Sequence, residues 1–258
     1  HRYVWQSILD PDPTALPTFS VEAVDSLALQ SGKVQPKQYD LTVLADVDRL
    51  NAEAARSLID ALAAGRGVAV LLGERAEPES FNLHLHAAGE GPMPFRLLRP
   101  LGGAAGSSIV RAPSISADDH PLLREFDEAV YREVLQSIPV WKWHGVASDS
   151  IATDAVVVLR VTDTDHTPLL IARPWRDGKF VCLTSTIASQ YRAERWNRLD
   201  DPMVAFPLLH GLAKWLALPA TDPFAAVVGA ELACSLPARP TEVEFQRPDR
   251  KSTRLNSS

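Results

Sequence analysis

The chain has 258 residues, of which 46% are hydrophobic, and a formal net charge of -6 at pH 7. This composition is ordinary for a globular protein, and the acidic balance gives no electrostatic reason to expect nucleic acid as a partner. No apolar stretch approaches the roughly 20 residues that a membrane span requires, and no signal-peptide pattern is present. The two cysteines, Cys182 and Cys234, are too far apart to indicate a disulfide framework or a metal-binding spacing.

Both ends of the chain indicate a piece of a longer protein. The spacing of Tyr3, Ile8 and Leu9 is that of a buried helix face, so the chain starts inside a helix and without an initiator Met. Residues 251–258 have no apolar periodicity and resemble translated adapter sequence, so we expect them to be a non-native tail. Just after the first helix, Phe19–Val24 alternates between apolar and other side chains and predicts a short strand.

The segment from Tyr39 to Glu74 carries the strongest fold signal. Two apolar runs without alternation, Leu41–Ala45 and Val68–Leu72, are typical of strands that are covered on both faces. Between them, apolar residues recur with the helical spacing i, i+3, i+4, i+7, at Ala55, Leu58, Ile59 and Leu62. Asn51 can cap this helix and Gly65 can end it. A strand–helix–strand unit of this length predicts a parallel α/β sheet.

A second block predicts strands joined by short turns. Three apolar runs, Ala155–Val161, Pro168–Ala172 and Phe180–Ile187, are separated by connections short enough to require antiparallel neighbours. The sheet is therefore expected to be mixed.

A helix is predicted to follow the three strands, with an apolar stripe at Leu208, Leu209, Leu212, Trp215 and Leu216. Pro207 fits its first turn and Pro219 ends it. Residues 219–250 then predict the start of a truncated β-rich segment, so the main domain is expected to span residues 1–218.

Two histidine motifs raise the question of a metal. His84 and His86 are predicted to share one face of an extended segment, which metal sites can use, but only His120 or Asp118 could supply a third ligand. We interpret both as solvated loop histidines, and we expect the stretch from Asp118 to Pro121 to cap a helix. No metal and no cofactor are predicted.

Three segments together resemble a known family. They are residues 39–50, the Gly65–Gly73 strand, and the block from Pro168 to Trp215 with its Gly178–Ser185 strand and the sequence Phe206–Leu212. They are similar to the glutamine-amidotransferase-like domain of large bacterial membrane proteins of the aerotolerance-regulator (Bat) type. In those proteins, membrane helices and a von Willebrand factor A-like domain precede this module.

The resemblance implies a flavodoxin-like fold of the class I glutamine-amidotransferase-like kind. Its sheet would be mixed but mostly parallel, with helices on both faces and a first strand upstream of His1. It further implies a domain tethered to the membrane through segments outside this sequence and located outside the cytoplasm.

True class I amidotransferases place a cysteine directly after the strand that corresponds to Val68–Leu72. Here that strand exit reads Leu71, Leu72, Gly73, and none of these side chains can attack a carbonyl group. We therefore expect no catalytic residues and no enzymatic activity.

The best binding candidates follow from the position of a loop. Residues 191–201 lie between the last strand and the last helix, at the carboxyl edge where α/β folds bind ligands. We take Tyr191, Trp196 and Asp200 from this loop, and Asp46 from the first motif, as ligand-binding candidates.

The sequence thus predicts a non-catalytic interaction or assembly module whose partners are proteins or neighbouring domains of the same chain. Two alternatives stay open. One is a hydrolase of the same fold acting on amide or glycosidic bonds. The other is a carbohydrate-sensing module, for which Trp141 and Trp143 could form a stacking platform, although core packing is the simpler interpretation of these two residues.

Overall fold

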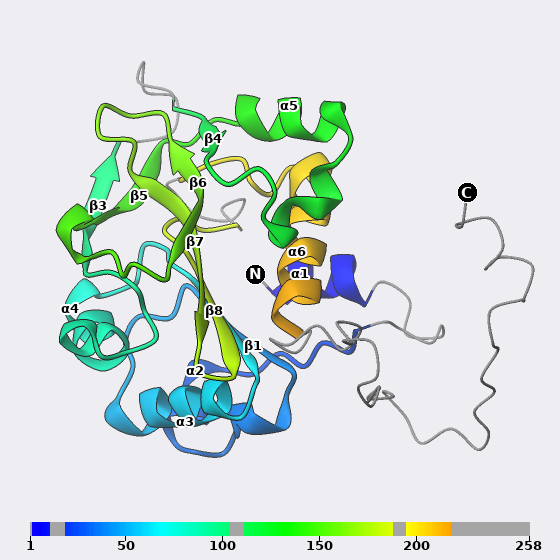
Figure 1. Ribbon diagram of the computed structural model, residues 1–258. Helices are drawn as coiled ribbons and strands as arrows, with labels where there is room; N and C mark the ends of the chain where they lie inside the picture. Colours follow the sequence, from blue (N-terminus) through cyan, green and yellow to red (C-terminus); the bar gives the residue numbers. More distant parts are fainter. Residues whose placement is uncertain (1, 11–18, 104–110, 188–194, 218–258) are drawn as a thin grey trace, which may run out of the picture. The chain divides into compact units, whose positions relative to one another are not determined.

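The structure, a computed structural model, describes residues 2–10, 19–103, 111–187 and 195–217 (Figure 1). The chain divides into two compact units, His1–Ala220 and Thr221–Ser258, and all described residues belong to the first. The predicted β-rich segment at 219–250 and the predicted tail at 251–258 therefore lie outside the described residues.

The first unit is built on a six-stranded sheet with the strand order β1-β2-β8-β7-β6-β4. Its strands are β1 (Leu41–Ala45), β2 (Gly67–Leu71), β4 (Pro113–Ile115), β6 (Val156–Val161), β7 (Pro168–Trp175) and β8 (Gly178–Leu183). The strands β1, β2 and β8 run parallel, whereas the pairs β8–β7, β7–β6 and β6–β4 are antiparallel.

This topology confirms the mixed α/β sheet but corrects its expected balance. We predicted a mostly parallel sheet, which is wrong, because only two of the pairings described above are parallel and three are antiparallel. The reason is the length of the connections, since the links between β6, β7 and β8 are too short for crossovers.

The predicted strand–helix–strand unit is confirmed. Helix α3 (Ala52–Ala63) joins the parallel strands β1 and β2. The side chain of Asn51 accepts a hydrogen bond from the N–H of Ala54, so it caps the helix as expected. Just beyond the helix, Gly65 has a φ of +82°, a conformation that glycine adopts without strain.

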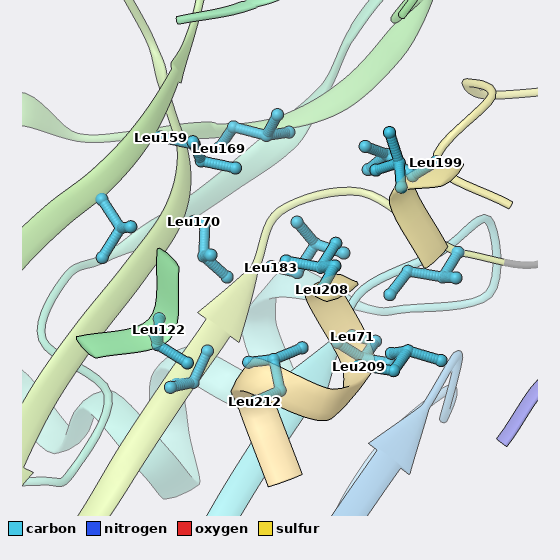
Figure 2. Close-up of a cluster of buried hydrophobic side chains, with 14 of the residues drawn as sticks. Leu71, Leu122, Leu159, Leu169, Leu170, Leu183, Leu199, Leu208, Leu209 and Leu212 are labelled. Atoms are coloured by element: carbon cyan, nitrogen blue, oxygen red, sulfur yellow. The ribbon is translucent and has the colours of Figure 1, made fainter. Parts of the chain in front are cut away.

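Alternate residues of β2 contribute to two cores on opposite faces of the sheet. Ala69 and Leu71 belong to the core formed with α1 (Arg2–Leu9), the 3₁₀ helix η4 (Pro121–Phe126), α5 (Ala129–Ser137) and α6 (Pro202–Ala217). Figure 2 shows leucines of this core converging from β2, β6, β7, β8, η4 and α6. Val68 and Val70 belong to the other core, formed with α3 and α4 (Pro78–Phe81). Helices thus cover both faces.

A separate two-stranded ribbon pairs β3 (Leu97–Gly102) with β5 (Lys142–Val146). The main-chain N–H of His144 in β5 donates to the oxygen of Thr184, which follows β8, at 2.7 Å. This bond joins the ribbon to the end of the large sheet. The remaining short elements are α2 (Ser26–Gln30), η1 (Pro36–Gln38), the π-helical turn η2 (Asn82–His86), η3 (Ala87–Gly89) and η5 (Ser148–Ser150).

Two local predictions are wrong. Residues 19–25 form no strand, and their side chains Phe19 and Val21 pack on the core instead. Pro207 lies inside α6 rather than in its first turn, because the helix begins at Pro202. Because proline has no backbone N–H, residue 207 cannot donate the helical hydrogen bond to the carbonyl oxygen of Met203.

Among the helices in the described ranges, none is both long enough and apolar enough to cross a membrane.

The central position of β2 predicts how a charge placed in this strand would change the stability of the protein. Val70 is 1% exposed and lies in the core shared with α3. Val70→Asp should lower the free energy of unfolding by at least about 4 kcal/mol, because it buries a carboxylate without a partner. The matched control is Val156→Asp, since Val156 lies on β6 with 38% of its surface exposed. Urea unfolding that gives similar losses for both variants would contradict the placement of β2.

A pH dependence follows from His120, whose Nδ1 accepts a hydrogen bond from the N–H of Leu122 at the start of η4. Its ring lies 5.2 Å from that of Trp215. Burial, with the positive charge of Lys179, lowers the pKa of His120 from 6.5 to about 4. Because unfolding raises this pKa, the unfolded chain binds a proton that the folded chain excludes. Stability should therefore fall as the pH is lowered from 6.5 towards 4.

The variant His120→Asn isolates this contribution, since the Asn side-chain oxygen can still cap η4 but does not titrate. Urea unfolding across the same pH range should show a shallower fall in stability for His120→Asn than for the wild type. Equal slopes would mean that His120 does not cause the effect.

Candidate functional site

The carboxyl ends of the parallel strands form the candidate site, because ligands of open α/β sheets bind at this edge. Strands β1, β2 and β8 run in the same direction, so the residues that follow them lie along one edge. Buried polar side chains gather in these segments, in the neighbouring strand β5, and in the segment that precedes α6. They are Asp46, His144, Thr184, Ser185, Thr186, Asn197 and Asp200.

Asp46 follows β1 and joins it to the exit of β2. Its φ of +52° is unusual for a residue other than glycine, and the residue is 2% exposed. Its carboxylate accepts hydrogen bonds from the main-chain N–H of Arg75 at 3.0 Å and from Arg75 Nε at 3.2 Å. A guanidinium nitrogen of Arg75 also donates to the main-chain oxygen of Asp46 at 2.6 Å. The Asp46 carboxylate is therefore held by the fold.

Gly73 lies two residues after the end of β2 and faces Asp46. A Cβ atom at this position would lie 2.4 Å from Oδ1 and 2.6 Å from Cγ of Asp46. Any side chain at position 73 would therefore require the Asp46 carboxylate or the backbone at position 73 to shift. The glycine and the buried carboxylate fit only as a pair.

His144 lies in β5 and is fully buried. Its Nε2 is 3.0 Å from the main-chain oxygen of Gly73, and its Nδ1 is 3.3 Å from that of Leu98. A neutral imidazole has one N–H and can donate to only one of these oxygens. Burial lowers the pKa of His144, and the opposing effects of the two carbonyl oxygens and Asp46 do not offset it. Both ring nitrogens thus face the backbone, and neither faces a nucleophile.

The hydroxyl groups that follow β8 are also bound within the fold. Ser185 Oγ donates to the main-chain oxygen of Lys142 at 2.9 Å and accepts from Asn197 Nδ2 at 2.7 Å. Asn197 Oδ1 accepts from the N–H of Leu199, and Thr184 Oγ1 donates to the oxygen of Pro168, both at 2.9 Å. These contacts join the residues that follow β8 to β5 and to the segment that precedes α6.

The predicted ligand candidates are only partly brought together. Tyr191 lies outside the described residues. Trp196 is 2% exposed, and the centre of its ring lies 5.4 Å from that of the His144 ring. The negative charge of Asp46 acts on the pKa of the same histidine, in the direction that raises it. Asp200 is buried and accepts both contacts from one guanidinium nitrogen of Arg195, at 2.9 and 3.0 Å. Asp46, His144 and Trp196 thus lie close to one another, whereas Asp200 belongs to a separate ion pair.

Other residues weighed from the sequence have structural surroundings. We predicted an extended segment at His84 and His86, which is wrong, because both lie in the π-helical turn η2. His86 is buried with Nδ1 3.2 Å from the main-chain oxygen of Met93. Trp143 is 4% exposed, as core packing requires. Among the described residues, no group of three His, Cys, Asp or Glu side chains is arranged to hold a metal ion.

Cys182 lies in β8 and is fully buried, and burial raises the pKa of its thiol far above the ordinary value. A thiol in this environment is not ionised at neutral pH and is a poor nucleophile.

Comparison with known proteins establishes the fold and no family. No family model matches the chain, and no curated protein matches it. Among solved structures, the cytoplasmic protein STM1381 from Salmonella typhimurium LT2 has a TM-score of 0.57 and 14% identity, with 82% of this chain and 86% of that chain covered. The mmIFT52 N-terminal domain has a TM-score of 0.51 and 15% identity, with 80% and 88% covered.

A looser superposition has a TM-score of 0.46 and 13% identity, and it covers 85% of this chain and 86% of a protein described as ThuA-like from Parabacteroides merdae ATCC 43184. Identities this low show at most a shared α/β fold. They say nothing about activity, substrate or partner.

Sequence reasoning missed three residues of the site, namely Gly73 as a packing partner, Arg75 and His144. The signal for Gly73 and Arg75 was present in the sequence. Asp46 follows the first predicted strand and residues 73–75 follow the second, and we expected these two strands to be neighbours. His144 could not be found in this way, because it comes from the ribbon, whose approach to the sheet has no local sequence signature.

A double-mutant cycle tests the contact between Gly73 and Asp46. Gly73→Ala should lower the free energy of unfolding by about 1–3 kcal/mol, since the added methyl group meets the carboxylate. In an Asp46→Gly background the same change should cost at least about 1 kcal/mol less, because the obstacle is gone. Glycine also accommodates the positive φ at position 46. If urea unfolding shows the same loss of unfolding free energy for Gly73→Ala in both backgrounds, residues 73 and 46 are not in contact.

Proposed function

We propose that this chain is a non-catalytic interaction or assembly module with a flavodoxin-like, glutamine-amidotransferase-like fold. The observation that carries this proposal is the close approach of Gly73 to Asp46. At the strand exit where an amidotransferase holds its nucleophile, this chain has a glycine whose missing side chain makes room for a buried, ion-paired carboxylate.

The surrounding groups support the same proposal. A general base must reach the proton that it removes, but the ring nitrogens of His144 both face main-chain oxygens. Ser185, a hydroxyl group at the same edge that could replace a cysteine, is bound to Lys142 and Asn197. An active site keeps such groups available to a substrate, whereas here they connect β2, β5 and β8 to one another.

The resemblance to the aerotolerance-regulator type supplies the wider context of the proposal. In that context the module belongs to a larger bacterial protein, is tethered to the membrane by segments outside this sequence, and lies outside the cytoplasm. Its partners would be other proteins or neighbouring domains, bound through the surface of the fold. The parallel order of β1, β2 and β8, with α3 between β1 and β2, is what such a fold requires.

The proposal predicts that the protein does not hydrolyse glutamine. Amide hydrolysis on this fold needs a thiolate beside an oxyanion hole, and Cys182 is a buried, protonated thiol within β8. Ammonia release from glutamine should equal the rate in buffer, and Cys182→Ala should leave it unchanged.

The same protein incubated with nitrophenyl esters and glycosides tests the alternative of a hydrolase with a different nucleophile. Turnover above the blank that is lost in Cys182→Ala or Ser185→Ala would show that the chain is an enzyme.

A further inference from the structure

The β3–β5 ribbon carries an exposed apolar patch. Leu98 and Leu101 of β3 are 38% and 44% exposed. Both lie against Gly145 of β5, since a Cβ atom at this glycine would be 3.1 Å from Leu98 Cβ and 3.2 Å from Leu101 Cδ1. The two leucines therefore lie side by side on one face of the ribbon, where they form a single patch.

Two arginines accompany these leucines in the sequence of the strand. Arg96 and Arg99 are exposed, and neither guanidinium group forms an ion pair with any residue that the structure describes. Arg96, Leu98, Arg99 and Leu101 together make up the ribbon face. Exposed apolar side chains and arginines are typical of protein interfaces, and unpaired charges of one sign favour a partner with the opposite charge.

The backbone of β3 offers no free edge for a further strand. The side chain of Asn82 accepts a hydrogen bond from the N–H of Leu97 at 2.7 Å and donates to its carbonyl oxygen at 2.8 Å. Further along the strand, Pro100 has no N–H to donate. A partner must therefore contact the ribbon face through side chains and not by strand addition.

A hollow with the complementary charge lies beside α5 of the same chain. It is open, has a volume of about 460 Å³, and is lined by Ala129, Arg132, Glu133, Gln136 and Ser137. The one cation among these lining residues, Arg132, is already paired with Asp118. The lining therefore leaves the carboxylate of Glu133 to meet a positive charge from outside.

Further negative charge and an apolar side chain border the hollow. Asp127 and Glu128 directly precede α5 and are exposed, as is Glu133 within the helix. Among the described residues, none of these three carboxylates has an ion-pair partner. Val130 of the same helix is 48% exposed. This surface thus has the two properties that the ribbon face requires, acidic groups and apolar contact area.

The two surfaces do not meet within one chain. Helix α5 packs against β4 and α6, whereas the ribbon is bonded to Thr184 after β8, and Figure 1 shows the two apart from each other. Strand β4 lies at the opposite end of the sheet from β1. A strand added beside β1 would therefore leave α5 uncovered.

We propose that copies of this chain associate through the ribbon face of one copy and α5 of another. The leucines of the ribbon face enter the hollow, and its arginines pair with Glu128 and Glu133. Opposite charges select this partner, whereas the net charge of -6 disfavours an anionic lipid surface. This inference rests on the proposed assembly function and names the partner as a second copy of the chain.

Sedimentation equilibrium measures this association. At about 100 μM, the wild type should have a mass above that of one chain. Arg96→Glu combined with Arg99→Glu should raise the dissociation constant at least about tenfold, because like charges would then face each other. The matched control is Arg49→Glu combined with Arg56→Glu. It makes the same charge change at exposed positions in and next to α3 and should leave the association unchanged.

A mixture of two variants identifies the surfaces. Glu128→Lys combined with Glu133→Lys should weaken self-association as strongly as the arginine changes do. Mixed in equal amounts, the two double variants should associate again, because glutamates on the ribbon face of one meet lysines on α5 of the other. If a charge change prevents folding, Leu101→Asn at its exposed position should still weaken association at least about threefold.

Three outcomes would overturn the proposal. They are a wild type that remains monomeric at about 100 μM, a mixture that associates no better than its two components, and equal weakening by the control variant. Binding to phosphatidylglycerol vesicles that is lost in the Arg96→Glu, Arg99→Glu variant would assign the ribbon face to a lipid surface instead. None of these outcomes measures glutamine hydrolysis, so failure here is distinguishable from failure of the proposed function.

Discussion

The contact between Gly73 and the carboxylate of Asp46 is the constraint on which the carboxyl edge of this sheet depends. It lets the exits of β1 and β2 approach closely enough for Arg75 to bind the carboxylate and the main chain of Asp46. It also leaves the oxygen of Gly73 facing His144, which brings the β3–β5 ribbon to the same edge. Removing the space at position 73 would disturb strands from both sheets.

This arrangement explains why a polar, buried edge need not be an active site. Buried polar groups are costly unless they are hydrogen-bonded, and here the side chains of Asp46, Ser185 and Asn197 bond to the backbone or to a neighbouring side chain. The His144 ring sits between two carbonyl oxygens, and Ser185 sits between Lys142 and Asn197. The same residue types that perform chemistry in other folds serve here to connect strands.

The parts of the fold that could be predicted are those with a local signal. The helical spacing from Ala55 to Leu62 and the uninterrupted runs on either side required a parallel crossover, and the structure has one. The strand predicted at Phe19–Val24 failed because alternation alone does not form a strand without a neighbour. Within the part of the chain that the structure describes, no backbone hydrogen bond joins these residues to a strand. For the site, Asp46 and Trp196 could be chosen from their positions after strands. Their connection through His144 could not, since it depends on how the ribbon packs against the sheet.

Nitrogen NMR of the His144 ring tests most directly whether this edge is internally bound rather than catalytic. The free imidazole titrates near 6.5, and burial lowers the pKa of His144 below this value. We therefore predict that the ring titrates with a midpoint below 6.5 and that its neutral form is a single tautomer. A ring that exchanges between tautomers and titrates with a midpoint at or above 6.5 would be an available base, and it would contradict the account.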